Sequence, residues 1–412
     1  FRLLAVVDTP DVTPALAARL LGHGPRGERL AEATLERLVD EQLLEEAAPG
    51  RYRFHDLVRL FARERAEADE PEPERAAARQ RVLAWYLATA ERADRLLRPA
   101  RPDAAAPGDE AAGDFTDRHG AVAWLEGERA NLVAVVRQAA EQADPEVAAI
   151  AWQLGEALFR FFDLRKHWAD WLAVCEPAVR AARRCGNRLA EARTVNRLAI
   201  VLREQGRASA AIVHLTRALA ISRKLGDVDL QGSILNNLGI AHQDEGDLTR
   251  AIQCHQQRLE LARAAGNRLD QGITLNNLGD IHRQQRHYRQ AVECFLDSLA
   301  VFEALEERRY VGMVLHNLGE VALEERRDHD ALDYHRRGLE CSREADDRFS
   351  EAYNLLGLGH ATARTRGREE ALPMWRLAWE ILDELHAPEA AQARQLLGEE
   401  HKPGARSSGG VA

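Results

Sequence analysis

Pairs of asparagine recur along this sequence, and a row of side-chain amides is a chemistry that can hold a polypeptide backbone. The pairs are Asn236-Asn237 and Asn276-Asn277, and His316-Asn317 stands where a third pair falls, again forty residues on. Each amide has two donor hydrogens and an acceptor oxygen, so a ladder of amides can bind an extended peptide without reading its sequence. The alternative is that the amides bond between adjacent helices and only hold the helices together. We predict a peptide-binding surface and leave that alternative open.

Two carboxylates follow these amides by one helical turn. Asp280 comes after the second pair and Glu320 after the third position, whereas Ile240 follows the first pair. Carboxylates there favour a basic partner, although they are equally compatible with ordinary solvated helix positions. The candidate peptide-binding residues are therefore Asn236, Asn237, Asn276, Asn277, Asp280, His316, Asn317 and Glu320.

Residues for catalysis or metal binding do not group in the sequence. His242 and His282 are also forty residues apart, but no third ligand is evident from their spacing, so we interpret them as packing residues and predict no metal site. No G-x-x-x-x-G-K-[ST] segment is present. The GHGPRG segment at 22–27 follows a predicted helix instead of a strand, and we interpret it as a loop between two helices. We therefore predict no enzyme activity and no cofactor bound by this chain alone.

The elements that position the amides repeat every forty residues. Five Leu-small pairs share one register: Leu198-Ala199, Leu238-Gly239, Leu278-Gly279, Leu318-Gly319 and Leu358-Gly359. Thirteen residues after each Leu comes an Ala: Ala211, Ala251, Ala291, Ala331 and Ala371. Apolar residues recur at helical spacing on both sides of a polar break, which indicates a helix, a short turn and a second antiparallel helix. Because one such pair cannot bury its own apolar stripe, the pairs must stack into an α-solenoid.

Composition limits the class of partner. The net charge is −10, with 45% hydrophobic and 30% charged residues, which describes a soluble globular protein. The negative charge argues against a non-specific grip on nucleic acid or on anionic membranes. No apolar run approaches eighteen residues, so we expect no membrane span. Five cysteines without a C-x-x-C pair are typical of reduced thiols, and we predict a cytoplasmic protein.

The first 66 residues differ from the repeats. Apolar spacing predicts helices at 1–7, 13–21 and 30–46, then a short β-wing containing Tyr52 and Phe54, then a helix that starts at His55 or Asp56. Three helices followed by a wing is a winged-helix arrangement, which raises the alternative of direct DNA binding. The helix at 30–46 carries more acid than base, and Arg51 and Arg53 of the wing are too few to reverse its charge. Nucleic acid is therefore an unfavoured partner.

The forty-residue units resemble tetratricopeptide repeats. The Leu-Gly of the first helix and the Ala of the second match that family in register, whereas its first-helix Trp and closing Pro are absent. A unit of forty residues implies longer helices, like those of the kinesin light chain class. In several tetratricopeptide families, asparagines at the matching positions line a peptide groove.

The front end is similar to the winged-helix module of NB-ARC signal-transduction ATPases, especially actinobacterial regulators that carry tetratricopeptide repeats. LERLVDEQLLEEAAPGRYRFHDLVRLFARERA carries the resemblance, with further likeness at 85–99, 121–140 and 158–172. In that family the matching histidine contacts the β-phosphate of ADP. The resemblance therefore assigns ADP sensing to His55 and Asp56, with ADP or ATP and Mg²⁺ bound by an upstream ATPase module. The alternative is that Asp56 caps the helix and His55 packs beside it.

The predicted organisation is all-α with one short wing. We expect a winged-helix module at 1–70, a helical connector at 71–145 with a flexible loop near 99–114, and a degenerate first repeat at 146–185. Five repeats at 186–385, a capping helix at 386–400 and a disordered tail at 401–412 follow. The predicted function is the sensor half of a nucleotide-switch regulator, which binds a protein or peptide, relays this to an ATPase module in cis, and can form homo-oligomers on activation. The rival predictions are a DNA-binding regulator and a stand-alone interaction scaffold.

Overall fold

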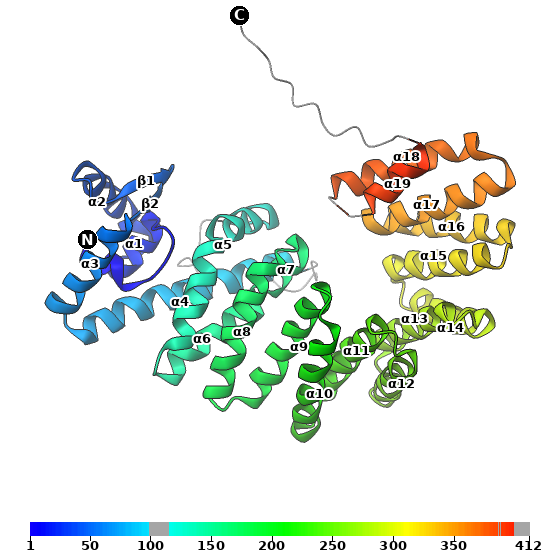
Figure 1. Cartoon of the computed structure of the whole chain (residues 1–412), viewed down its shortest axis with the longest axis horizontal. Helices are drawn as coiled ribbons and strands as arrows, with labels where there is room; N and C mark the ends of the chain where they lie inside the picture. Colours follow the sequence, from blue (N-terminus) through cyan, green and yellow to red (C-terminus); the bar gives the residue numbers. More distant parts are fainter. Residues whose placement is uncertain (99–114, 386, 388, 399–412) are drawn as a thin grey trace, which may run out of the picture. The chain divides into compact units, whose positions relative to one another are not determined.

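Almost all of the described chain is helical (Figure 1). The computed structural model describes residues 1–98, 115–385, 387 and 389–398. It forms two compact units, Phe1–Ala241 and His242–Ala412, each with its own core. Within these described residues the one sheet is a two-stranded hairpin, which confirms the predicted all-α class with a short wing.

The N-terminal segment of the first unit has the predicted order of helices, hairpin and helix. Its elements are the 3-10 helix η1 (Arg2–Val6), α1 (Pro14–Leu20), the 3-10 helix η2 (Pro25–Gly27), α2 (Glu28–Asp40), β1 (Glu45–Ala48), β2 (Arg51–Arg53) and α3 (Asp56–Asp69). The Thr13 side chain accepts a hydrogen bond from the Leu16 amide and so begins α1. The loop predicted at 22–27 does join two helices, α1 and α2. That this segment is a winged-helix module remains a prediction.

Two boundaries in this segment were predicted wrongly. Residues 2–6 form a 3-10 helix instead of a regular α-helix. The helix predicted to run to Glu46 ends at Asp40, because Gln42 adopts a left-handed φ of 58° and turns the chain. Glu46 instead pairs with Tyr52 in the antiparallel hairpin.

Long helices follow this segment within the first unit. They are α4 (Glu72–Leu97), α5 (Arg118–Glu141), α6 (Pro145–Ala157), α7 (Phe159–Arg165) and α8 (Trp168–Arg184). Helix α4 packs against α1, α5 and α6, and it is the long helix that runs away from the hairpin in Figure 1. The helices α6 to α8 occupy the stretch where a degenerate repeat is expected. The loop predicted at 99–114 lies outside the described residues.

Helices of 17 or 18 residues then alternate at the forty-residue interval. They are α9 (Arg188–Glu204), α10 (Ala208–Leu225), α11 (Val228–Asp244), α12 (Leu248–Ala264), α13 (Arg268–Gln284), α14 (Tyr288–Ala304), α15 (Arg308–Glu324), α16 (Asp328–Glu344), α17 (Arg348–Thr365) and α18 (Arg368–Glu384). In the second unit, successive helices from α12 to α18 pack as antiparallel neighbours, as the pairs α15–α16 and α17–α18 show in Figure 1. The predicted solenoid architecture is therefore confirmed.

The small residue after each Leu allows a ring from the second helix to pack closely. A Cβ on Gly279 would lie 2.6 Å from the Phe295 ring, and one on Gly359 would lie 2.4 Å from Nε1 of Trp375. Both rings are almost fully buried. The glycines thus act through close helix–helix approach, as the sequence indicates.

The described chain ends on α19 (Ala390–Leu397), which packs against α18. The capping helix predicted at 386–400 is therefore shorter, and the tail predicted at 401–412 lies outside the described residues. Among the described helices, none is long and apolar enough to cross a membrane.

Candidate functional site

The regular spacing of the amides along the chain brings amides of successive repeats into contact. The Asn237 side chain donates to Oδ1 of Asn196 at 2.9 Å, and Asn317 donates to Oδ1 of Asn276 at 2.8 Å. In both pairs the donor lies forty-one residues after the acceptor, so each bond joins the first helices of successive repeats. These bonds hold neighbouring helices in register.

Burial of the amides favours the alternative in which they bond between adjacent helices and hold the helices together. Asn237 and Asn276 are only 9% and 7% exposed, while Asn236, Asn277 and Asn317 are half-buried. The expectation of an open row of amides is therefore wrong for Asn237 and Asn276, because each side chain is covered and bonded within the stack. Peptide binding at the half-buried amides stays a prediction.

The two predicted carboxylates have different surroundings. Asp280 accepts hydrogen bonds from Arg283 at 2.9 Å and Gln243 at 2.8 Å, and Arg283 also bonds Glu324 at 2.7 Å. Asp280 is thus already compensated by a cation of its own helix. Burial raises the pKa of Glu320, although Arg283 opposes this shift. Glu320 lies 3.6 Å from the ring of His335, a residue that the sequence analysis did not single out.

An apolar cavity of about 370 Å³ lies between the first turns of α15 and α17. It is lined by Arg309, Tyr310, Met313, His316, Asp347, Phe349, Ser350 and Tyr353. The ring of Phe349 is 4.9 Å from that of Tyr353, and the Tyr353 ring is 5.6 Å from His316. Of the predicted site residues, only His316 lines this cavity.

Sequence reasoning missed the aromatic lining for an identifiable reason. The position of Met313 and Tyr353 is occupied by Ser233 and Ile273 in earlier repeats, so the apolar surface builds up only toward the last two. A comparison of the repeats position by position, in a chain with only 6% aromatic residues, could have found this signal.

A charged pair borders the same cavity. Arg309 donates to Asp347 at 2.9 Å. Although burial acts to raise it, the pKa of Asp347 is lowered by hydrogen bonds from Ser350 and by the Arg309 guanidinium. The Asp347 carboxylate is therefore charged at neutral pH, so the cavity offers apolar rings beside an anion and a cation.

His55 and Asp56 lie at a second cavity, of about 670 Å³, in the first unit. His55 directly precedes α3, its side chain is 59% exposed, and its Nε2 is 3.6 Å from Oε2 of Glu45. Asp56 is the first residue of α3 and does not cap it, so the alternative interpretation of both residues is wrong. Arg53, Arg59 and Arg137 also line the cavity, which gives it several cations. ADP sensing at His55 and Asp56 stays a prediction.

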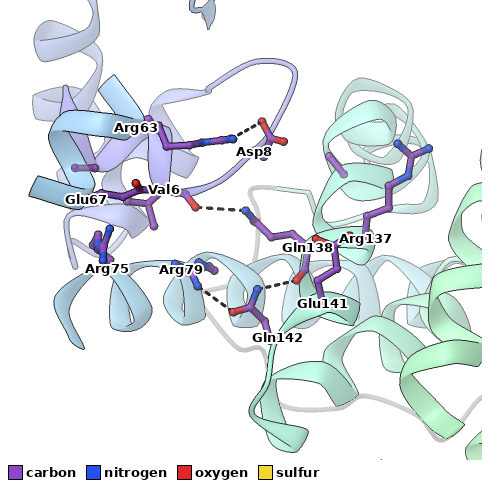
Figure 2. A pocket seen from close by; sticks show the side chains of 13 residues that line it. Val6, Asp8, Arg63, Glu67, Arg75, Arg79, Arg137, Gln138, Glu141 and Gln142 are labelled. Carbon is purple, nitrogen blue, oxygen red and sulfur yellow. Dashed lines mark hydrogen bonds and ion pairs between the residues drawn. The ribbon is translucent and has the colours of Figure 1, made fainter. Parts of the chain in front are cut away.

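A neighbouring cavity of about 420 Å³ is bounded by the N-terminal segment, α3, α4 and α5. Figure 2 shows three contacts in it that join these elements. Arg63 pairs with Asp8 at 3.2 Å, and Arg79 donates to Gln142 at 2.9 Å. Gln138 donates to the carbonyl oxygen of Val6 at 3.3 Å. The polar lining thus connects the N-terminal segment to the long helices.

A partly buried ion-pair network makes the same connection through the hairpin. Arg51 of β2 bonds Asp11 at 2.7 Å and Glu128 of α5 at 2.6 Å. Glu128 also accepts from Tyr86 of α4 at 2.7 Å and from Asn131 at 2.9 Å. Burial, then the Glu128 charge, raises the pKa of Tyr86 well above its ordinary value. The hairpin is therefore bonded to α5 directly and is connected to α4 through Glu128.

The same network bears on the DNA-binding alternative. Arg51 is compensated by two carboxylates, and Arg53 is paired with Glu45. Neither arginine of the hairpin is an uncompensated charge for phosphate. That nucleic acid is an unfavoured partner stays a prediction.

The stacked helical hairpins and their forty-residue register are those of tetratricopeptide repeats. Tetratricopeptide-repeat family models match residues 192–225 and 230–304 of the chain. The chain therefore carries tetratricopeptide repeats, as its resemblance to that family implies.

Two curated relatives are regulators. The chain is 39% identical over 233 residues to the regulatory protein AfsR of Streptomyces griseus, a match that covers 55% of this chain and 23% of that protein. It is 47% identical over 146 residues to AfsR of Streptomyces coelicolor, which covers 34% of this chain and 14% of the relative. The chain thus matches less than a quarter of the length of either relative.

Among solved structures, the chain is similar to a signal-transduction ATPase with a tetratricopeptide-repeat sensor from Pyrococcus horikoshii. The identity is 13% and the TM-score 0.49, over 96% of this chain and 58% of that one. It is also similar to NprR in complex with its cognate peptide NprX, at 12% identity and a TM-score of 0.46, over 67% of this chain and 82% of that one. At these levels neither likeness bears on function.

Proposed function

We propose that this chain is the sensor part of a regulator and that its second unit binds a peptide segment of another protein. The observation that carries the proposal is the cavity between α15 and α17. Its volume of about 370 Å³ suits one or two apolar side chains of a peptide, and a peptide needs such an anchor because backbone contacts alone discriminate poorly.

The chemistry of the lining specifies the anchor. Tyr310, Met313, Phe349 and Tyr353 offer aromatic and thioether surface, and Phe349 is 46% exposed. Rings of this kind dominate binding energy at protein interfaces. The Arg309–Asp347 pair at the border supplies a donor and an acceptor for the peptide backbone. The partner is therefore an extended or helical segment with an apolar or aromatic anchor residue.

A peptide selection tests this proposal with matched variants. Peptides are selected from a displayed library on the full chain, and the affinity of the best one is then measured for Phe349→Ala and Leu296→Ala. Leu296 is an equally exposed apolar residue of α14, 45% against 46% for Phe349, and does not line the cavity. We expect Phe349→Ala to weaken binding about tenfold or more, and Leu296→Ala to leave it unchanged. Equal peptide affinity of the two variants would show that the peptide does not bind in this cavity.

We further propose that the first unit relays peptide binding to an ATPase module in cis. The similarity to the regulatory protein AfsR supports a regulatory role, and the relay is supported by the bonds that tie the hairpin and the N-terminal segment to α5. A change at the hairpin would be transmitted to this helix because separating Arg51 from Glu128 leaves the buried Glu128 carboxylate without its cation. ADP or ATP with Mg²⁺ would be held by the ATPase module, and His55→Ala in a protein containing it should lower ADP retention. Unchanged ADP retention in the His55→Ala variant would show that His55 does not sense ADP.

A further inference from the structure

Three metal-ligating side chains meet where α15 packs on α16. They are His316 and Glu320 of α15 and His335 of α16. One ring nitrogen of each histidine and a carboxylate oxygen all lie within 4.8 Å of one another. Nε2 of His335 is 3.6 Å from Oε1 of Glu320, and the two rings are 5.4 Å apart.

The fold brings these residues together through two different constraints. His316 and Glu320 are four residues apart and so share one face of α15. His335 occupies the position where a ring must pack on the small residue of the repeat, since a Cβ on Gly319 would lie 2.5 Å from its Nε2. In the preceding repeat Phe295 fills the same place against Gly279. A hydrocarbon ring therefore satisfies the packing requirement at this position.

His335 carries two nitrogens that packing alone does not need. Its side chain is 0% exposed, and neither ring nitrogen makes a hydrogen bond of ordinary length with a described residue, although the nearby Asn354 side chain acts to raise its pKa. The amide of nearby Asn354 donates instead to the carbonyl oxygens of Ser350, at 2.9 Å, and Gly312, at 3.3 Å. A buried polar atom without a partner costs about 1–3 kcal/mol, a cost that a bound ion would remove.

The charges around the cluster leave room for a cation. Burial lowers the pKa of His335 to about 3 and that of His316 to about 4, so both rings are neutral at pH 7 with lone pairs available. Arg283 and Arg364 approach Glu320 from α13 and α17. Their charges are compensated, because Arg283 bonds Asp280 and Glu324, and Arg364 bonds Asp328. The nearby ring of His360 from α17 adds no ligand to the cluster within these distances.

Two imidazoles and one carboxylate are a ligand set typical of zinc with an open position. Bond lengths of about 2.0–2.2 Å place ligand atoms roughly 3.4 Å apart around a tetrahedral ion, close to the separation of His335 and Glu320. His316 also lines the cavity between α15 and α17, so a fourth ligand can be water that enters from there.

We propose that His316, Glu320 and His335 form a binding site for a divalent transition-metal ion, with Zn²⁺ as the ion that the ligand set fits best. All three ligands come from the two helices of one hairpin, and one of them, His316, also lines the cavity proposed for the peptide. The sequence-based prediction of no metal site considered only His242 and His282, and this proposal goes beyond it.

The repeat register supplies matched variants for the test. His335→Phe keeps a ring where Phe295 already shows that a phenyl ring packs. His255 stands at the same repeat position as His335, is 0% exposed and also lacks partners at both ring nitrogens in the described residues. His255→Phe is therefore the control for removing a buried histidine without removing the cluster. Glu320→Gln is a second test variant at a half-buried position.

The experiment is calorimetric titration of ZnCl₂ into the metal-free, tag-free 412-residue chain, together with the visible spectrum of the Co²⁺ form. We expect one ion per chain, a spectrum of nitrogen and oxygen ligands, and at least tenfold weaker binding in His335→Phe and Glu320→Gln. His255→Phe should bind as the unchanged chain does, and melting curves should show both phenylalanine variants folded. Unchanged Zn²⁺ affinity in a folded His335→Phe, or a Co²⁺ spectrum with thiolate bands from the free cysteines, would overturn the proposal.

Discussion

Asn317 of α15 donates its side-chain amide to Oδ1 of Asn276 of α13 at 2.8 Å, and this bond joins the first helices of two successive repeats. The pair explains why amides recur at a forty-residue interval without forming an open row. The first two repeats are joined in the same way, because Asn196 accepts from Asn237. These amide pairs are therefore elements of the stack, and the cavity proposed for the partner lies beside Asn317, at His316.

Asn276→Ala should destabilise the chain by about 1–2 kcal/mol, because the amide of Asn317 is left with no acceptor at a covered position. Thermal melting followed by circular dichroism measures this. In a double-mutant cycle with Asn317→Ala, the coupling should be about 1 kcal/mol. Gln256→Ala, at an exposed position of α12, is the neutral control. Additive effects of Asn276→Ala and Asn317→Ala would show that the bond contributes nothing.

Glu128→Ala should destabilise the first unit by about 1–3 kcal/mol, because Tyr86 loses its acceptor and the half-buried Arg51 keeps only Asp11 as a partner. Limited proteolysis should cut the N-terminal segment faster in this variant. Glu128→Gln keeps an acceptor for Tyr86 and should restore part of the protection. If Glu128→Ala resisted proteolysis as well as the unchanged chain, the network would not couple the hairpin to α4 and α5.

Acid should weaken the chain through His255. Burial, with a smaller effect of Arg258, lowers the pKa of His255 from 6.5 to about 4. Below pH 6.5 the unfolded chain binds a proton at this residue while the folded chain does not, so the free energy of unfolding falls as the pH drops toward 4. The slope is at most about 1.4 kcal/mol per pH unit. Above pH 6.5 His255 is neutral in both the folded and the unfolded chain, so this loss of stability is absent.

His255→Phe should remove that part of the slope. Denaturant unfolding at pH 7.0 and 5.0 measures the difference between the two conditions for each protein. The variant should lose less stability than the unchanged chain when the pH is lowered. An equal loss in both proteins would mean that His255 does not remain neutral in the folded state.

The repeat architecture could be predicted from sequence because its signal is redundant. The same helix–turn–helix pattern occurs five times, each time with counterparts of Leu238-Gly239 and Ala251. Gly279 packs closely on Phe295, as expected of a small residue at that position. The N-terminal boundaries were less predictable. The apolar pattern that ends α2 continues into β1, and only the left-handed turn at Gln42 separates them.

The candidate site was only partly predictable for a similar reason. The periodicity located the helix face that carries Asn237 and Asn317, but it could not state whether an amide bonds to a peptide or to the next repeat. The residues that distinguish the cavity and the histidine cluster are those that differ from the repeat pattern. Tyr353 and Phe349 line the cavity, and His335 replaces the phenylalanine of the preceding repeat.

Hydrogen–deuterium exchange of the full chain with and without a library-selected peptide tests the central claim most directly. Amides in the first turns of α15 and α17, near Tyr310 and Phe349, should exchange more slowly when the peptide is bound. The outer helices α14 and α16 and the first unit should keep their exchange rates. Protection confined to those other helices, with α15 and α17 unchanged, would contradict the proposal that this cavity is where the chain holds its partner.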